Sequence, residues 1–122
     1  MTSALVLPGL EEPPLERGGG VRTWYLVTRE RGAIEFLTWI TEFDPGTSLA
    51  PHFHNCQESV TVLEGRAVFE AAGEEGNLAQ NAATLVPTGT VHRFRNPGPN
   101  RLRILFVFGS VNATRTVVAD TR

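Results

Sequence analysis

Two histidines, a cysteine and a glutamate stand close together in the stretch PHFHNCQES, residues 51–59. Imidazoles with a carboxylate can hold a metal ion, a thiol beside a base can act as a nucleophile, and the same residues can form a polar turn. The side chains that could do this chemistry are His52, His54, Cys56 and Glu58. The strands that would carry them help to decide between these readings.

Alternation along a strand places these side chains on shared faces. His52 and His54 are two residues apart in an expected strand, so both imidazoles project from one face. Glu58 begins the next strand and shares a face with Val60 and Val62. A carboxylate that leads an apolar face inward is costly without a partner, and a cation shared with two imidazoles would be one.

A third histidine lies far along the chain. His92 follows the turn PTGT and begins the run HRFRN, where it shares a face with Phe94. Three neutral imidazoles and one carboxylate suit Mn, Fe, Ni, Cu or Zn, and an octahedral ion so bound keeps two positions for water or substrate. The simpler alternative is that these side chains are solvated or hydrogen-bonded at strand ends.

The rest of the chain supplies the strands. Short β-rich runs alternate with turn signals such as DPGT, AGEEGN and NPGPN, a pattern typical of an antiparallel sandwich or small barrel. Residues 1–20 are dense in Pro, Gly and Glu, which predicts an irregular arm before a single domain over residues 21–122. The expected strands are 23–28, 33–43, 50–54, 59–65, 67–71, 83–87, 91–96 and 101–110.

Composition excludes several function classes. The single cysteine cannot form an intramolecular disulfide, and 13 acidic against 11 basic residues do not suggest the basic stripe that nucleic acid requires. The apolar run SALVLPGL is too short for a signal core or a membrane span. We therefore expect a cytoplasmic protein that binds neither nucleic acid nor membrane.

The spacing of the site residues resembles a known family. From Gly46 the chain runs five residues to His52, one to His54, three to Glu58 and six to Gly65, which is similar to the first motif of the cupin superfamily. The second cupin motif is resembled by Pro87, Gly89, His92 and Asn96. Asn81 stands where that motif has Gly, and Asn also tolerates a left-handed backbone.

The resemblance implies an all-β fold, a single-domain cupin β-barrel (double-stranded β-helix or jelly roll) of six to eight strands. It also implies that His52, His54, Glu58 and His92 bind one divalent transition metal ion. Cupins commonly pair as dimers that exchange N-terminal segments, and the expected strands 33–43 and 101–110, apolar on both faces, likewise favour a homodimer.

The remaining residues bear on the ligand. We expect Trp39, Phe106 and Phe108 to line a small apolar pocket beside the metal. No inward-pointing arginine is evident near the ligands, because Arg93 and Arg95 face away from His92 by alternation, so a small neutral or weakly acidic molecule is favoured. We expect Cys56 to pack structurally, since histidines committed to a metal cannot serve as its base.

The predicted function is that of a metal-dependent enzyme acting on such a molecule, with dioxygenase-like chemistry first and isomerase or lyase chemistry next. The chain has no lysine and one tyrosine, Tyr25, which favours chemistry carried by the metal over a multi-residue acid-base mechanism. The alternative is a non-catalytic module that binds a small molecule or a metal, because cupin folds host many functions.

Overall fold

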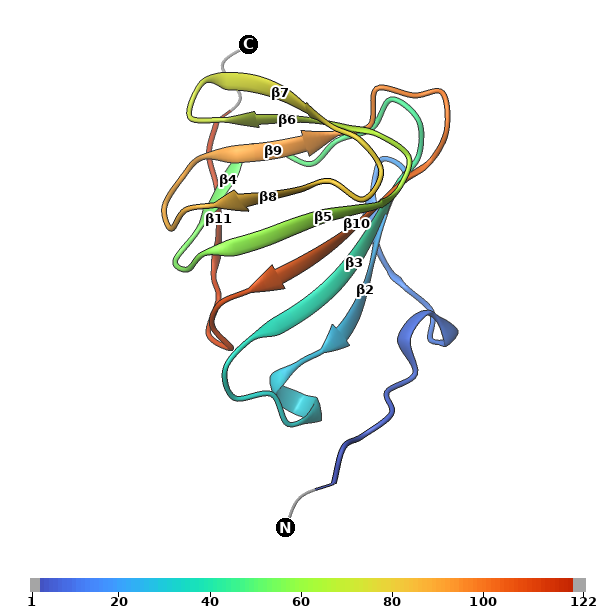
Figure 1. Cartoon of the computed structure of the whole chain (residues 1–122), viewed down its shortest axis with the longest axis vertical. Helices are drawn as coiled ribbons and strands as arrows, with labels where there is room; N and C mark the ends of the chain where they lie inside the picture. The colour runs from blue at the N-terminus through green and yellow to red at the C-terminus, as the bar shows by residue number, and fades with distance from the viewer. Residues whose placement is uncertain (1–2, 120–122) are drawn as a thin grey trace.

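The computed structural model describes residues 3–119, which form two antiparallel sheets facing each other (Figure 1). Two short 3-10 helices, η1 (Gly9–Glu11) and η2 (Arg29–Arg31), accompany the strands. The strands are β1 (Leu15–Gly18), β2 (Val21–Val27), β3 (Leu37–Phe43), β4 (His52–His54), β5 (Glu58–Glu64), β6 (Ala67–Ala71), β7 (Glu74–Leu78), β8 (Ala83–Val86), β9 (His92–Arg95), β10 (Leu102–Phe108) and β11 (Arg115–Val117).

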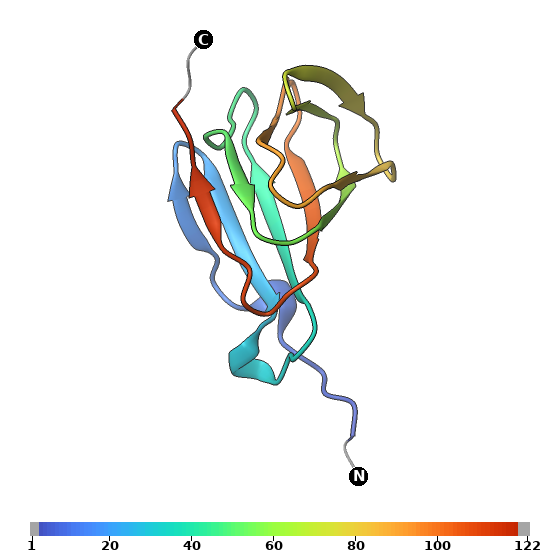
Figure 2. The same ribbon diagram turned by 90° about the vertical axis from the view of Figure 1, so that its left-hand side faces the viewer.

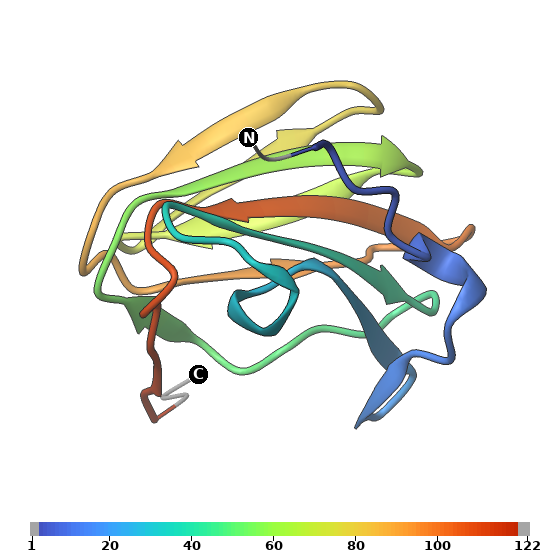
Figure 3. The same ribbon diagram turned by 90° about the horizontal axis from the view of Figure 1, so that it is seen from below.

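The strand order is that of a jelly roll. One sheet runs β1-β2-β3-β10-β5-β8 and the other runs β11-β4-β9-β6-β7, so neighbours in space are often far apart in sequence. Figure 3 shows the same arrangement from below. The predicted all-β jelly-roll barrel is therefore confirmed. No helix within residues 3–119 has the length and apolar character needed to cross a membrane.

The core lies between the sheets and follows the alternation in the sequence. In β10 the residues Leu102, Ile104, Phe106 and Phe108 are buried, whereas those between them are partly exposed. β10 pairs with β3 on one side and β5 on the other, which places Phe106 opposite Val60. Burial on alternate residues of neighbouring strands gives the barrel its apolar interior.

Four secondary-structure predictions were wrong. The expected strand over residues 33–43 begins only at Leu37, because η2 and a bend precede it and leave Ile34 83% exposed. Leu15–Gly18, inside the expected irregular arm, forms β1 and pairs with β2. β7 begins inside the predicted turn AGEEGN and ends one residue after it, and β11 lies in a segment with no predicted strand. The described residues thus form eleven strands, more than the six to eight expected.

Positive φ angles and a buried amide explain several motif positions. Asn81 has a φ of 69°, so it adopts the left-handed backbone expected where the family motif has glycine. Gly65 has a φ of 87°, and a Cβ there would collide with the backbone oxygen of Arg101. The Asn96 side chain is 1% exposed. Its amide nitrogen donates to the backbone oxygens of Phe43 and Asn100, and its oxygen accepts from the Gly98 N–H, so it holds the 96–100 turn against β3.

Candidate metal centre

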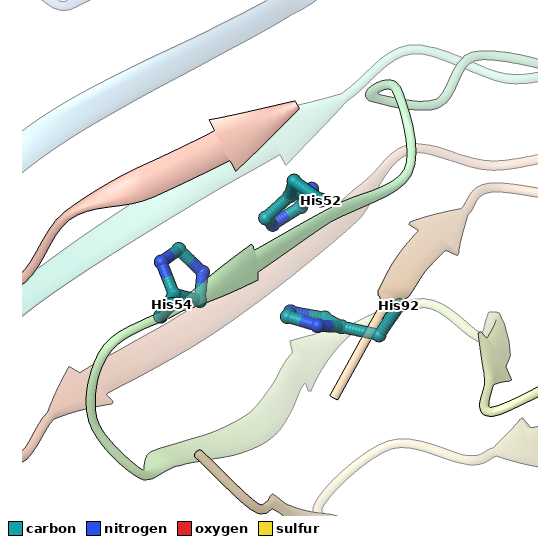
Figure 4. Close-up of side chains that lie close together, drawn as sticks. All are labelled: His52, His54 and His92. Atoms are coloured by element: carbon teal, nitrogen blue, oxygen red, sulfur yellow. The ribbon is translucent and has the colours of Figure 1, made fainter. Parts of the chain in front are cut away.

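The three histidines converge between the sheets. His52 and His54 extend from β4 and His92 extends from β9, with their rings turned toward one another (Figure 4). His52 and His92 are directly paired residues of β4 and β9. All three side chains are buried, and one ring nitrogen from each lies within 4.8 Å of those of the other two. The histidines of the first motif and of the distant second motif therefore meet at one point.

Backbone carbonyls determine which nitrogen of each neutral ring carries the proton. The Nδ1 atoms of His52, His54 and His92 lie 2.7, 2.9 and 2.8 Å from the backbone oxygens of Ala50, Thr114 and Thr90 respectively. A carbonyl can only accept a hydrogen bond, so each neutral ring carries its proton on Nδ1. Each Nε2 then presents a lone pair, and this is how a second-shell carbonyl prepares a histidine to bind a metal.

Glu58 faces the same point from the opposite sheet. Its side chain is almost fully buried, with Oε1 3.0 Å from Nε2 of His92 and Oε2 3.4 Å from Nε2 of His54. Neither an unprotonated nitrogen nor a carboxylate oxygen can donate, and the Nε2 atoms of His54 and His92 and Oε1 of Glu58 have no hydrogen-bond partner. A cation among these atoms would satisfy all three, so the donor set fits a metal ion.

The surroundings favour the neutral form of His52 and the ionised form of Glu58. The pKa of His52 is lowered to about 4, chiefly by burial; the nearby His92 and Arg115 act in the same direction, and the hydrogen bond with the Ala50 carbonyl acts against them. Burial alone would raise the pKa of Glu58, but its contacts with His54 and His92 outweigh this and lower it below its ordinary value. Neutral imidazoles and a carboxylate are the forms that bind metals.

An apolar pocket leads to this centre. Its cavity volume is about 30 Å³, room for about two water molecules. The predicted lining residues Trp39, Phe106 and Phe108 are confirmed, and Phe108 contacts both Trp39 and the ring of His54. The other lining residues are Arg17, Thr41, Phe43, Leu49, His52, His54, Glu58, Phe94 and Arg115.

Two of the lining residues correct a prediction. The sequence showed no inward-pointing arginine near the ligands, yet Arg17 of β1 and Arg115 of β11 line this pocket. Sequence reasoning missed them because both strands lie in segments that were not predicted as strands. Arg93 and Arg95 do lie on the opposite face of β9 from His92, as expected.

The surroundings of Cys56 do not favour a nucleophile. It packs against the hydrophobic core, and burial raises the pKa of its thiol. A reactive cysteine requires the opposite shift, toward the thiolate. The structure thus supports the packing role expected for Cys56.

Comparison with known proteins identifies the family. A family model described as "Cupin domain" matches residues 39–108, which include all four candidate ligands. The chain is 33% identical over 96 residues to "Polyketide synthase CurC" of Streptomyces cyaneus, which covers 78% of this chain and 62% of that protein. It is 31% identical over 94 residues to "Tetracenomycin polyketide synthase protein TcmJ" of Streptomyces glaucescens, covering 76% and 63%. The chain therefore spans less than two thirds of the length of these relatives.

Solved structures share the fold. The polyketide cyclase RemF from Streptomyces resistomycificus superposes with a TM-score of 0.81 at 21% identity, covering 100% of this chain and 89% of that one. KdgF from Halomonas sp. superposes with a TM-score of 0.75 at 19% identity, covering 90% and 97%. At these identities the likeness shows the fold alone.

Proposed function

The chain belongs to the cupin domain family, and from that premise we propose that it is a metal-dependent enzyme acting on a small oxygen-rich organic molecule. His52, His54, His92 and Glu58 would hold one divalent transition metal ion. The observation that carries this proposal is the convergence of unprotonated Nε2 atoms and a buried carboxylate with no other partner. Mn, Fe, Ni, Cu and Zn all accept such a donor set.

The residues that line the pocket indicate what the protein itself would contribute to the reaction. Apart from the four candidate ligands, its titratable lining residues in the described chain are Arg17 and Arg115, and arginine does not give up its proton in proteins. The bound metal would supply Lewis acidity toward a carbonyl, enol or phenol oxygen. The chain would orient the molecule with Trp39, Phe106 and Phe108 and would exclude water from the reacting end.

The relatives suggest the class of reaction. Two are named as polyketide synthase proteins, and a protein of the same fold is a polyketide cyclase. We propose that this chain catalyses a cyclisation of a compound with neighbouring carbonyl groups, which is lyase or isomerase chemistry. Dioxygenase-like chemistry is the second candidate, since the ligand set also suits iron and could leave positions for dioxygen.

One experiment separates these alternatives. Protein purified without chelator is analysed for metals, together with His54→Ala, and is then incubated with an aromatic polyketone with and without air. Cyclisation with dehydration gives a product lighter by one water and proceeds without air. Dioxygen insertion gives a heavier product and consumes oxygen. Metal binding without turnover of any substrate would favour the non-catalytic binding module.

We also propose that the protein forms a homodimer through its N-terminal arm. Figures 1 and 2 show the first described residues running away from the barrel, and the Leu5 and Val6 side chains are 71% and 101% exposed. Apolar side chains so exposed are stabilised when a second copy covers them. Sedimentation of the full chain and of a Leu5→Ser, Val6→Ser variant tests this, with a monomeric native protein as the contradicting result.

A further inference from the structure

Two arginines reach the metal pocket from strands at the edges of different sheets. Arg17 belongs to β1, the edge of the six-stranded sheet, and Arg115 belongs to β11, the edge of the five-stranded sheet. Both line the pocket that also contains His52, His54 and Glu58. The pocket therefore has a cationic part beside its apolar wall.

Strand register explains why Arg115 faces this pocket. β11 pairs antiparallel with β4, and Arg115 is the direct partner of His54. Directly opposed residues of an antiparallel pair project from the same face of the sheet. Because His54 points inward, Arg115 lies on the same inner face.

A β-bulge aims Arg17 in the same direction. The register of β1 against β2 shifts between Glu16 and Gly18, so Arg17 is the residue between the two aligned pairs. Bulges of this kind redirect a side chain, and they are common beside active sites. Nη1 of Arg17 donates to Oγ1 of Thr23 at 3.1 Å, and Thr23 is fully buried and bonded to Thr41. The guanidinium is thus held against the barrel interior.

These two positive charges lack the carboxylate partners that other arginines have. Arg22 and Arg103, for example, both bind Glu42. Within residues 3–119, neither Arg17 nor Arg115 has a carboxylate at ion-pair distance. Burial lowers the pKa of Arg115, and the charge of Arg17 lowers it further. Two like charges that share a pocket are unfavourable until an anion joins them.

We infer that Arg17 and Arg115 bind a carboxylate on the substrate, whose neighbouring oxygen atoms then face the three imidazoles. This inference rests on the proposed function and narrows its substrate to a small aromatic or polyketone acid. The planar guanidinium matches the two oxygens of a carboxylate, and the apolar wall formed by Trp39, Phe106 and Phe108 suits a ring. The cavity of about 30 Å³ admits only the reacting end, so the acid group stays near the pocket mouth, where Arg115 is exposed.

Salicylate and its neutral amide are the probes. Calorimetric titration of zinc-loaded protein compares their affinities for the native chain, Arg17→Gln, Arg115→Gln and the control Arg66→Gln. Arg66 is exposed, bonds only Asn77 through its side chain in the described structure, and its replacement removes the same charge. We expect each pocket variant to weaken salicylate binding about tenfold or more without changing amide binding, and we expect no change in the control. Arg115→Lys should recover part of the affinity, because it restores the charge without the planar fork.

The outcomes distinguish this inference from the metal proposal. Native protein that binds salicylate no better than the amide, or pocket variants that bind salicylate as the native chain does, would overturn the arginine inference even if zinc is stoichiometric. Loss of salicylate binding in the arginine variants of a chain that binds no zinc would retain the carboxylate site and reject the metal centre. Circular dichroism and thermal unfolding establish that each variant is folded.

Discussion

His52 and His92 are direct cross-strand partners, with ring centroids 4.5 Å apart, although forty positions separate them in the chain. β4 carries the first motif and β9 the second, and their pairing is what joins the two motifs into one site. His54 lies two residues along β4 and faces the same interior. The relative placement of the three histidines thus depends on the register of one pair of short strands.

Replacing His92 should weaken metal binding strongly. His92→Ala removes one of three converging Nε2 atoms, and we expect metal affinity to fall more than tenfold. Elemental analysis and metal titration measure this. Cys56→Ser is the matched control, because Cys56 lies between His54 and Glu58 in sequence but packs against the core. Loss of metal from Cys56→Ser, or its retention by His92→Ala, would contradict the proposed ligand set.

Glu58→Gln should stabilise the metal-free protein while weakening metal binding. The Gln amide can donate to Nε2 of His92, which the carboxylate cannot do, so a buried atom without a partner gains one. We expect unfolding free energy to rise by about 1 kcal/mol and metal affinity to fall. Chemical denaturation with and without metal measures both. A less stable metal-free variant would indicate that Glu58 is already satisfied without a cation.

The metal-free protein should lose stability as the pH falls from about 6.5 to about 4. The pKa of His52 is about 4 in the folded chain, below its ordinary 6.5, so in this range the unfolded chain binds more protons. The contribution of His52 to the free energy of unfolding is therefore fully present above about pH 6.5. By pH 4 roughly 3 kcal/mol of this free energy is lost. The lowered pKa of Glu58 adds a further loss of stability, which begins only as the pH falls below its ordinary value of 4.5. Denaturation at several pH values measures the slope of unfolding free energy against pH. We expect this slope to be shallower in His52→Gln.

Gly65→Ala should destabilise the fold more than Gly73→Ala. Both glycines have positive φ angles, 87° and 81°, which cost an alanine about 1 kcal/mol. A Cβ at Gly65 also meets the Arg101 backbone oxygen, whereas at Gly73 nothing lies within 4 Å. We expect a loss of about 2 kcal/mol or more at Gly65 and about 1 at Gly73. Equal losses in denaturant unfolding would show that the loop around Arg101 yields.

Local patterns in the sequence predicted much of the site. Alternation with period two placed His52 and His54 on one face, and Glu58, Val60 and Val62 on another, and both assignments are confirmed by their burial. The side-chain direction along a strand depends only on the extended backbone, so it can be derived without knowing the neighbouring strands. The family motifs then identified which residues belong together.

Polar strands at sheet edges could not be predicted in this way. β7 reads EEGNL and β11 reads RTV, and neither shows the apolar alternation of a buried strand. Edge strands bury little surface, and they form because a neighbouring strand offers hydrogen bonds. β1 lies similarly within a segment rich in proline and glycine. The pocket-lining arginines on β1 and β11 were missed for this reason.

The sequence by itself determined the all-β class, the inward faces of the ligand strands, and the candidate ligands His52, His54, Glu58 and His92. Only the tertiary structure decided that carbonyls orient the rings and that Arg17 and Arg115 share the pocket. Alternation is a property of one extended segment, whereas pairing partner, register and bulges arise from contacts between segments far apart in the chain. The inward direction of the candidate ligands can therefore be derived from single segments of the sequence. Which other side chains lie beside them in the pocket depends on the assembled barrel.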